Sequence, residues 1–168
     1  PVDYLVPNAG IAELGDSLDV ACFERQWAVN GAGALNTLAA LRAELAKPAS
    51  VVFVGTFLTR STFPGLAAYI ASKAALVAHA RTLAVEFAPL NVRINVVSPG
   101  PTATAIWGTL GLAEEQLEQV AEGVTQRLLP GHFLESAAVA NVILFQLSQG
   151  ARGVYGQDWV VDNGYTLN

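Results

Sequence analysis

The segment GLAAYIASKAAL, residues 65–76, holds two side chains whose types and spacing suit proton transfer, Tyr69 and Lys73. They stand four positions apart, so on a helix they lie one turn apart on the same face. A free phenol has a pKa of about 10, which is too high for efficient proton transfer at neutral pH. A neighbouring ammonium favours the phenolate, so Lys73 is expected to lower the pKa of Tyr69. Tyr69 would then give a proton to a carbonyl oxygen while hydride reaches the carbonyl carbon, or take the proton back in the reverse direction.

The same pair has a plainer interpretation. A tyrosine can close the edge of a core, and a lysine can lay its methylenes on apolar surface while its ammonium reaches water. The face that carries the pair continues in apolar residues, which predicts that it packs on a sheet and is not a solvated surface. Those residues are Leu76, Ala80, Leu83 and Phe87.

Short β-branched runs alternate along the chain with longer helical patterns. This order predicts β-α-β units, a mostly parallel sheet and an α/β fold in a single domain over residues 1–168. Asp16 or Ser17 is expected to cap the first helix, and Pro89 to stop the second. The expected strands are 2–6, 51–55, 92–97 and 159–162, and the expected helices are 18–46, 67–88, 113–128 and 136–149.

The loops that follow the first three strands carry the unusual residues. Parallel sheets bind ligands beyond the carboxyl ends of their strands, so these loops are where a site is expected. Asn8, Ala9 and Gly10 follow the first strand, and the segment 55–65 follows the second. SPGPTAT, residues 98–104, follows the third and is made rigid by its two prolines.

Several of these features occur in one order: NAG after a strand, Asn30 in the next helix, a hydroxyl residue thirteen positions before the Tyr-x-x-x-Lys pair, and PG after the following strand. In this the chain resembles the short-chain dehydrogenase/reductase family from end to end, and its closing segment VYGQDWVVDNGYTLN looks like the family's last strand. The resemblance implies a Rossmann-like doubly wound sheet with helices on both faces, of which this chain is the later portion. It implies an oxidoreductase that uses NADP or NAD to interconvert a hydroxyl and a carbonyl.

Carried over by position, the resemblance assigns roles to individual residues. Tyr69 becomes the acid/base and Lys73 its partner and a ribose ligand, while Asn30 supports a proton-relay water. Without the family, Asn30 is equally well interpreted as a kink residue beside Gly31 and Gly33. The segment lining the cofactor is Asn8, Ala9 and Gly10, and the loop at the nicotinamide end matches Pro99, Gly100 and Thr104.

Two departures from the family's pattern stand out. Thr56 occupies the position where the family usually has serine; it keeps the hydroxyl but adds a methyl and stiffens χ1. The family's glycine-rich turn, which holds a pyrophosphate at a helix N-terminus, has no counterpart here. We therefore expect the domain to be incomplete at its N-terminus, leaving the strand 2–6 with an unpaired edge. The departures keep open an alternative, a non-catalytic binding or scaffolding protein that has lost dinucleotide binding.

The composition and net charge of the chain exclude some classes of binding partner. The net charge of -5 and the pI near 4.9 argue against nucleic acid and anionic membrane surfaces. Cys22 is the single cysteine, so no disulfide framework or thiolate metal cluster is expected, and a cytoplasmic location is the default. The expected partner is a small carbonyl or alcohol substrate. Four apolar residues beside the expected site are interpreted either as a substrate wall or as ordinary core: Phe57, Leu58, Ile106 and Trp107. The family resemblance implies that 106–112 acts as a lid. Small residues on one face of the second helix allow close helix packing, and the family resemblance implies that such packing joins subunits of a homo-oligomer, a dimer or tetramer. These residues are Ala71, Ala74, Ala75 and Ala78.

Overall fold

The four strands of the computed structural model, which describes residues 1–168, pair in chain order and all run parallel. Their bounds are β1, Val2–Leu5; β2, Leu45–Val54; β3, Val92–Pro99; and β4, Asp158–Val161. β1 pairs only with β2, so its other edge is open, as the sequence predicts. The parallel sheet is confirmed, and each predicted strand is present.

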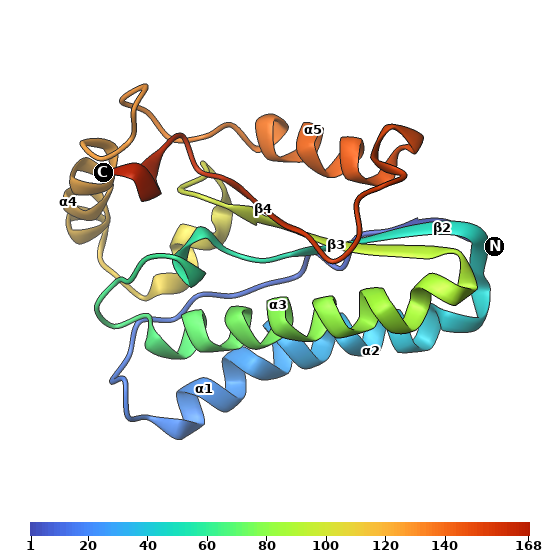
Figure 1. The fold of residues 1–168 in the computed structure, drawn as a ribbon. Coiled ribbons are helices and arrows are strands. Elements are labelled where there is room, and N and C mark those ends of the chain that lie inside the picture. The colour runs from blue at the N-terminus through green and yellow to red at the C-terminus, as the bar shows by residue number, and fades with distance from the viewer.

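Helices cover both faces of this sheet, as expected of a doubly wound fold (Figure 1). Helices α1, α2 and α3 lie on one face and α5 lies on the other, while α4 stands beyond the strand ends near the C-terminus. The bounds are α1, Val20–Trp27; α2, Ala34–Leu41; α3, Ala67–Phe87; α4, Glu114–Thr125; and α5, Ser136–Leu147. None of them is long and apolar enough to cross a lipid bilayer.

The first predicted helix is where the sequence interpretation errs most. It is divided by a π-helical turn, Ala28–Gly33, and β2 already begins at Leu45, so the expected helix 18–46 extends too far. Leu45 is buried and pairs with Val2 of β1, and this tertiary pairing overrides local helix propensity. The cap is also different, because Asp19 accepts from the Cys22 amide at 3.2 Å.

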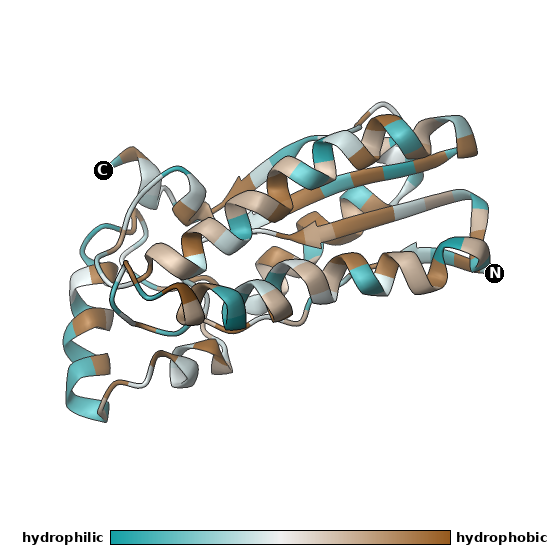
Figure 2. Cartoon of the chain, turned by 90° about the horizontal axis from the view of Figure 1, so that it is seen from below, coloured by the Kyte–Doolittle hydropathy of each residue, from teal (hydrophilic) through white to brown (hydrophobic).

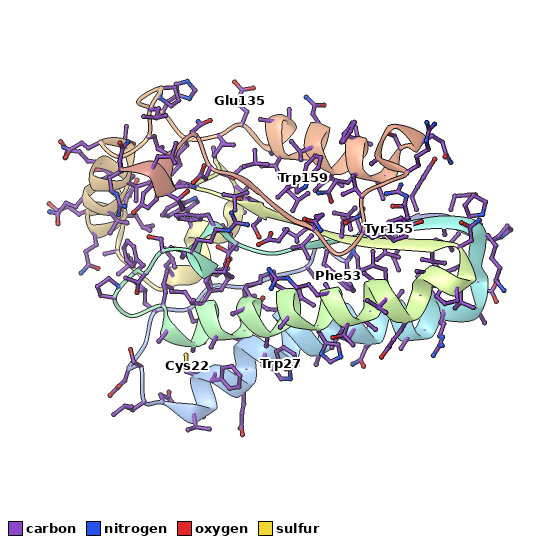
Figure 3. The ribbon with its side chains drawn as sticks, viewed as in Figure 1. Cys22, Trp27, Phe53, Glu135, Tyr155 and Trp159 are labelled. Atoms are coloured by element: carbon purple, nitrogen blue, oxygen red, sulfur yellow. The ribbon has the colours of Figure 1, made fainter.

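The core lies in two layers, one on each side of the sheet. Phe53 of β2 is fully buried between the sheet and α3 (Figure 3). On the opposite face Val52 and Val97 pack with Val139 and Leu147 of α5. The strands are largely brown in the hydropathy view and α4 is largely teal (Figure 2), which fits strands buried on both faces.

The small residues of α3 lie largely on its exposed side. Ala71, Ala74 and Ala78 are exposed, and Ala75 is half-buried. The face is open in the single chain, and association through it stays a prediction.

Candidate active site

One cavity of about 830 Å³ opens at the carboxyl ends of β1, β2 and β3. This volume lies within the usual range of small-molecule sites, about 300–1,000 Å³. The cavity is lined by every site residue predicted from the sequence except Asn30: Asn8, Ala9, Gly10, Thr56, Tyr69, Lys73, Pro99, Gly100 and Thr104. The fold therefore brings together residues from four separated segments of the chain.

Helix α3 presents Tyr69 and Lys73 to this cavity from its first two turns. Both side chains are buried, at 8% and 4% exposure. The Lys73 Nζ donates to the main-chain oxygen of Val54, the last residue of β2, at 2.8 Å. This hydrogen bond fixes the ammonium at the end of the strand, and the plainer interpretation of Lys73 as a snorkelling surface lysine is wrong.

The predicted effect of Lys73 on the pKa of Tyr69 is not what the structure shows. Burial raises the pKa of the Tyr69 phenol above its ordinary value, and a hydrogen bond with the Thr56 side chain lowers it by less. The phenolate loses its water on burial, and this cost exceeds the help from its neighbours. Tyr69 is thus a neutral phenol that carries its proton at physiological pH, but burial makes it a weaker acid than a free phenol.

Burial acts on the ammonium as well. It lowers the pKa of Lys73 from 10.5 to about 8, because a buried cation lacks hydration and the site holds no carboxylate to compensate. Between pH 8 and 10.5 the unfolded chain therefore binds a proton that the folded chain has released. The free energy of unfolding must rise with pH in this window.

We expect wild-type stability to increase from pH 8 towards pH 10 by up to about 1.4 kcal/mol per pH unit. Above about pH 10 the raised pKa of Tyr69 acts in the opposite sense, because the folded chain keeps a proton that the unfolded chain loses. In Lys73→Met the rise should vanish, and the variant should be more stable than wild type at pH 7. Urea unfolding followed by circular dichroism at several pH values tests this. A rise that persists in Lys73→Met would show that another group causes it.

Asn30 lies behind the cavity wall in the π-helical turn and is fully buried. Its Oδ1 accepts from the Ile11 amide at 2.9 Å, and its Nδ2 donates to the Ile11 carbonyl at 2.9 Å and to Ser72 Oγ at 3.0 Å. The side chain thus ties the segment after β1 to α3. The kink interpretation is supported, since the turn interrupts the helix, and the water-relay role stays a prediction.

The same contacts position Gly10 beside the lysine. A Cβ on Gly10 would lie 3.3 Å from Asn30 Oδ1 and 3.4 Å from Lys73 Nζ. Such separations are tight for a side chain, so glycine lets the backbone pass close to both polar groups. Gly10 therefore lines the cavity with its main chain.

Thr56 is buried where β2 gives way to a short helical turn, Phe57–Thr59. Its Oγ1 accepts from the Leu58 amide at 3.3 Å, a long bond that leaves the hydroxyl available to Tyr69. Threonine thus keeps the contact between hydroxyl and phenol that serine would make.

Three further residues shape the site and were not identified from the sequence. Ser72 joins Asn30 and donates to the Tyr69 carbonyl at 2.7 Å. Thr109, in the 3-10 helix Ala105–Leu110 of the predicted lid, accepts from the Ala12 amide at 3.0 Å. Its single hydroxyl hydrogen lies within reach of two carbonyl oxygens, those of Ala12 and Ile106, each at 2.8 Å. Tyr165 lines the cavity and packs edge-on to Phe57, with ring centroids 4.9 Å apart. Only Ser72 had a sequence signal, its place beside Lys73.

The predicted apolar wall is present. Phe57 and Leu58 are buried, Ile106 and Trp107 are half-buried, and all four line the cavity. The arrangement therefore combines a phenol that can donate a proton, a buried cation and an adjoining apolar surface.

Comparison with known proteins shows that the chain is similar to reductases and dehydrogenases. A family model described as "Enoyl-(Acyl carrier protein) reductase" matches residues 1–166. The chain is 32% identical to carbonyl reductase [NADPH] 2 of Sus scrofa, covering 98% of this chain and 68% of that protein. It is 36% identical to 2,3-dihydro-2,3-dihydroxybenzoate dehydrogenase of Escherichia coli, covering 99% of this chain and 70% of that one.

Solved structures agree in fold. The angucycline C-6 ketoreductase LanV with bound NADP superposes with a TM-score of 0.87 at 28% identity, over 99% of this chain and 63% of that chain. A short-chain dehydrogenase/reductase from Brucella melitensis superposes with a TM-score of 0.85 at 27% identity, over 97% of this chain and 64% of that chain. The chain thus spans less than two thirds of these two structures. Together with the parallel sheet and the cavity at its strand ends, these matches show that the chain belongs to the short-chain dehydrogenase/reductase family.

Proposed function

We propose that this chain carries the catalytic and substrate-binding part of an NAD(P)-dependent oxidoreductase that interconverts a carbonyl and a hydroxyl. The observation that carries the proposal is the meeting of Tyr69, Thr56 and Lys73 in one cavity at the strand ends. The named activities of the relatives, a carbonyl reductase and a dehydrogenase, support the reaction class.

Tyr69 serves as the acid in carbonyl reduction. Its raised pKa keeps the phenol protonated, so it donates a hydrogen bond to the substrate oxygen and transfers its proton as the alcohol forms. Thr56, hydrogen-bonded to the phenol, helps to hold the same oxygen. In the oxidation direction the phenolate takes the proton back.

Lys73 supports the fit of a nicotinamide cofactor. Its ammonium has three donors and makes one hydrogen bond, to Val54 O at 2.8 Å, so two remain for acceptors within the cavity. Ribose hydroxyls are acceptors of the right kind. When bound, the cofactor supplies or accepts the hydride.

The loops at the strand ends complete the proposed cofactor contacts. Asn8, Ala9 and Gly10 form the wall beside Lys73, and Pro99 and Gly100 form the wall after β3. Thr104 is exposed at the start of the lid helix, where its hydroxyl is open to a ligand. Asn30 acts as a positioning residue, through Ile11 and Ser72.

Nucleotide binding tests the proposal on the protein at its natural length. Trp107 lines the cavity, whereas Trp27 and Trp159 do not, so NADPH or NADH should quench the fluorescence of Trp107. Lys73→Met should weaken nucleotide binding by about tenfold, as loss of charge-assisted hydrogen bonds implies. Absence of quenching by both nucleotides would contradict the proposal.

A second candidate follows from one of the comparisons. The chain is 32% identical, over 99% of its length, to a protein named "Inactive 2-(S)-hydroxypropyl-CoM dehydrogenase 2". This favours a binding protein that keeps the fold without the reaction. Nucleotide binding together with turnover would exclude this candidate.

A further inference from the structure

The cavity has two chemically different parts. At the strand ends it is lined by main chain and by polar side chains, including Lys73 and Thr56. Beyond Tyr69 it continues into what we call the apolar lobe, walled by Leu14, Phe63, Leu66, Ile106, Leu110 and Val120. These residues belong to one continuous hydrophobic cluster that also contains Tyr69.

No charged side chain lines the apolar lobe. Lys73 is the only Lys, Arg, His, Asp or Glu among all the residues that line the cavity. Its Nζ is held at the end of β2 by Val54 and lies beside Gly10, on the strand side of the cavity. A carboxylate, sulfonate or phosphate in the lobe would thus be buried without a cation to pair with it.

Two neutral polar groups around the lobe already make hydrogen bonds within the protein. Trp107 Nε1 donates to the Thr102 carbonyl at 2.8 Å. The Tyr165 phenol oxygen accepts from Arg127 Nη1 at 3.0 Å, and the guanidinium lies over that ring at 4.0 Å. The side-chain hydrogen-bonding groups left for a ligand are uncharged: those of Tyr69 and Thr56, the hydroxyl of Thr104 and the phenol hydrogen of Tyr165.

The helix that walls one side of the lobe also carries acidic side chains. Val120 and Val124 of helix α4 line the cavity. The other sides of this helix carry exposed glutamates: Glu114, Glu115 and Glu118. Glu135, at the start of α5, points outward from the same end of the molecule (Figure 3).

We infer that the apolar lobe selects an uncharged substrate whose single polar group is the carbonyl or hydroxyl at Tyr69, carried on a hydrocarbon ring or chain. The identity of this group as the reacting one rests on the proposed function. The preference itself is a property of binding and is measured without turnover.

Three para-substituted acetophenones of similar size test the inference: 4-isopropylacetophenone, 4-acetylbenzamide and 4-acetylbenzoate. Calorimetric titration of the protein, with and without NADP, should give the lowest Kd for the isopropyl compound. The Kd of the amide should be higher, and that of the carboxylate higher by at least about 30-fold. A carboxylate that binds within threefold of the isopropyl compound would overturn the inference, and so would failure of all three to bind.

A pair of variants at Leu110 tests whether a cation placed at the lobe allows a carboxylate to bind there. Leu110 is half-buried in the lid helix, so Leu110→Arg can place a guanidinium at the lobe, and Leu110→Met is the uncharged control. The arginine variant should bind 4-acetylbenzoate about tenfold more tightly than wild type, and the methionine variant should not. A folded arginine variant without this gain would place the carboxylate outside the lobe and overturn the inference. If the ranking holds but no compound is turned over, the proposed reaction fails and the binding preference stands.

Discussion

Tyr69→Phe should lower kcat for carbonyl reduction by about 1,000-fold, within the range that general acid catalysis contributes. The substitution removes the phenol hydrogen that is to be transferred and keeps the ring that fills the buried site, at 8% exposure. Nucleotide affinity should stay nearly unchanged, because the proposed ribose contact comes from Lys73. Steady-state kinetics with NADPH, combined with fluorescence titration of the nucleotide, measures both quantities.

Thr56→Ser is the matched control for this result. It keeps the hydroxyl beside Tyr69 and removes only the methyl, so kcat should change by a few-fold at most. Turnover by Tyr69→Phe within tenfold of wild type would refute the assignment of Tyr69 as the proton donor. A large loss in Thr56→Ser would instead show that the methyl group shapes the site.

Gly100→Ala should destabilise the fold by about 3 kcal/mol, near the upper end of the usual cost of overpacking. An added Cβ would lie 2.5 Å from the Cα of Asp162, whose backbone cannot move without disturbing the end of β4. The Gly100 amide also donates to the Val161 carbonyl at 2.8 Å, so the two strand ends cannot simply separate. Tm should fall by roughly 10 °C for a domain of this size, measured by circular dichroism or calorimetry.

Gly108→Ala provides the comparison within the lid helix. A Cβ at Gly108 meets no atom within 4 Å, so stability should stay within about 0.5 kcal/mol of wild type. Equal effects of the two substitutions would show that the close approach of Gly100 to Asp162 does not govern stability.

The strands were predictable because a strand that is buried on both faces has a nearly continuous run of apolar residues. The run 51–54, Val-Val-Phe-Val, is apolar whichever way its side chains point. The end of the first helix was harder to predict. Leu45 and Ala46 continue its helical pattern, but they belong to β2, which pairs with β1 through Leu45 and Val2. No local signal distinguishes a residue that will pair with a strand more than forty positions earlier.

For the site, the sequence predicted which residues line the cavity, but it did not predict the direction in which the pKa of Tyr69 is shifted. Spacing alone puts Tyr69 and Lys73 on one helix face, and strand order brings three loops together. The pKa of Tyr69 depends on how deeply the phenol is buried, which spacing does not reveal. Thr109 and Tyr165 were missed for a similar reason, since their partners Ala12 and Phe57 lie 97 and 108 positions away.

The paired hydrogen bonds between Thr109 and Ala12 have a consequence for how molecules get in and out. They join the 3-10 helix Ala105–Leu110 to the segment after β1. Each bond has a net worth of about 1 kcal/mol, since water replaces it on opening. We therefore expect that entry of a ligand past this helix requires these contacts to break and re-form, on the microsecond-to-millisecond timescale typical of such motions.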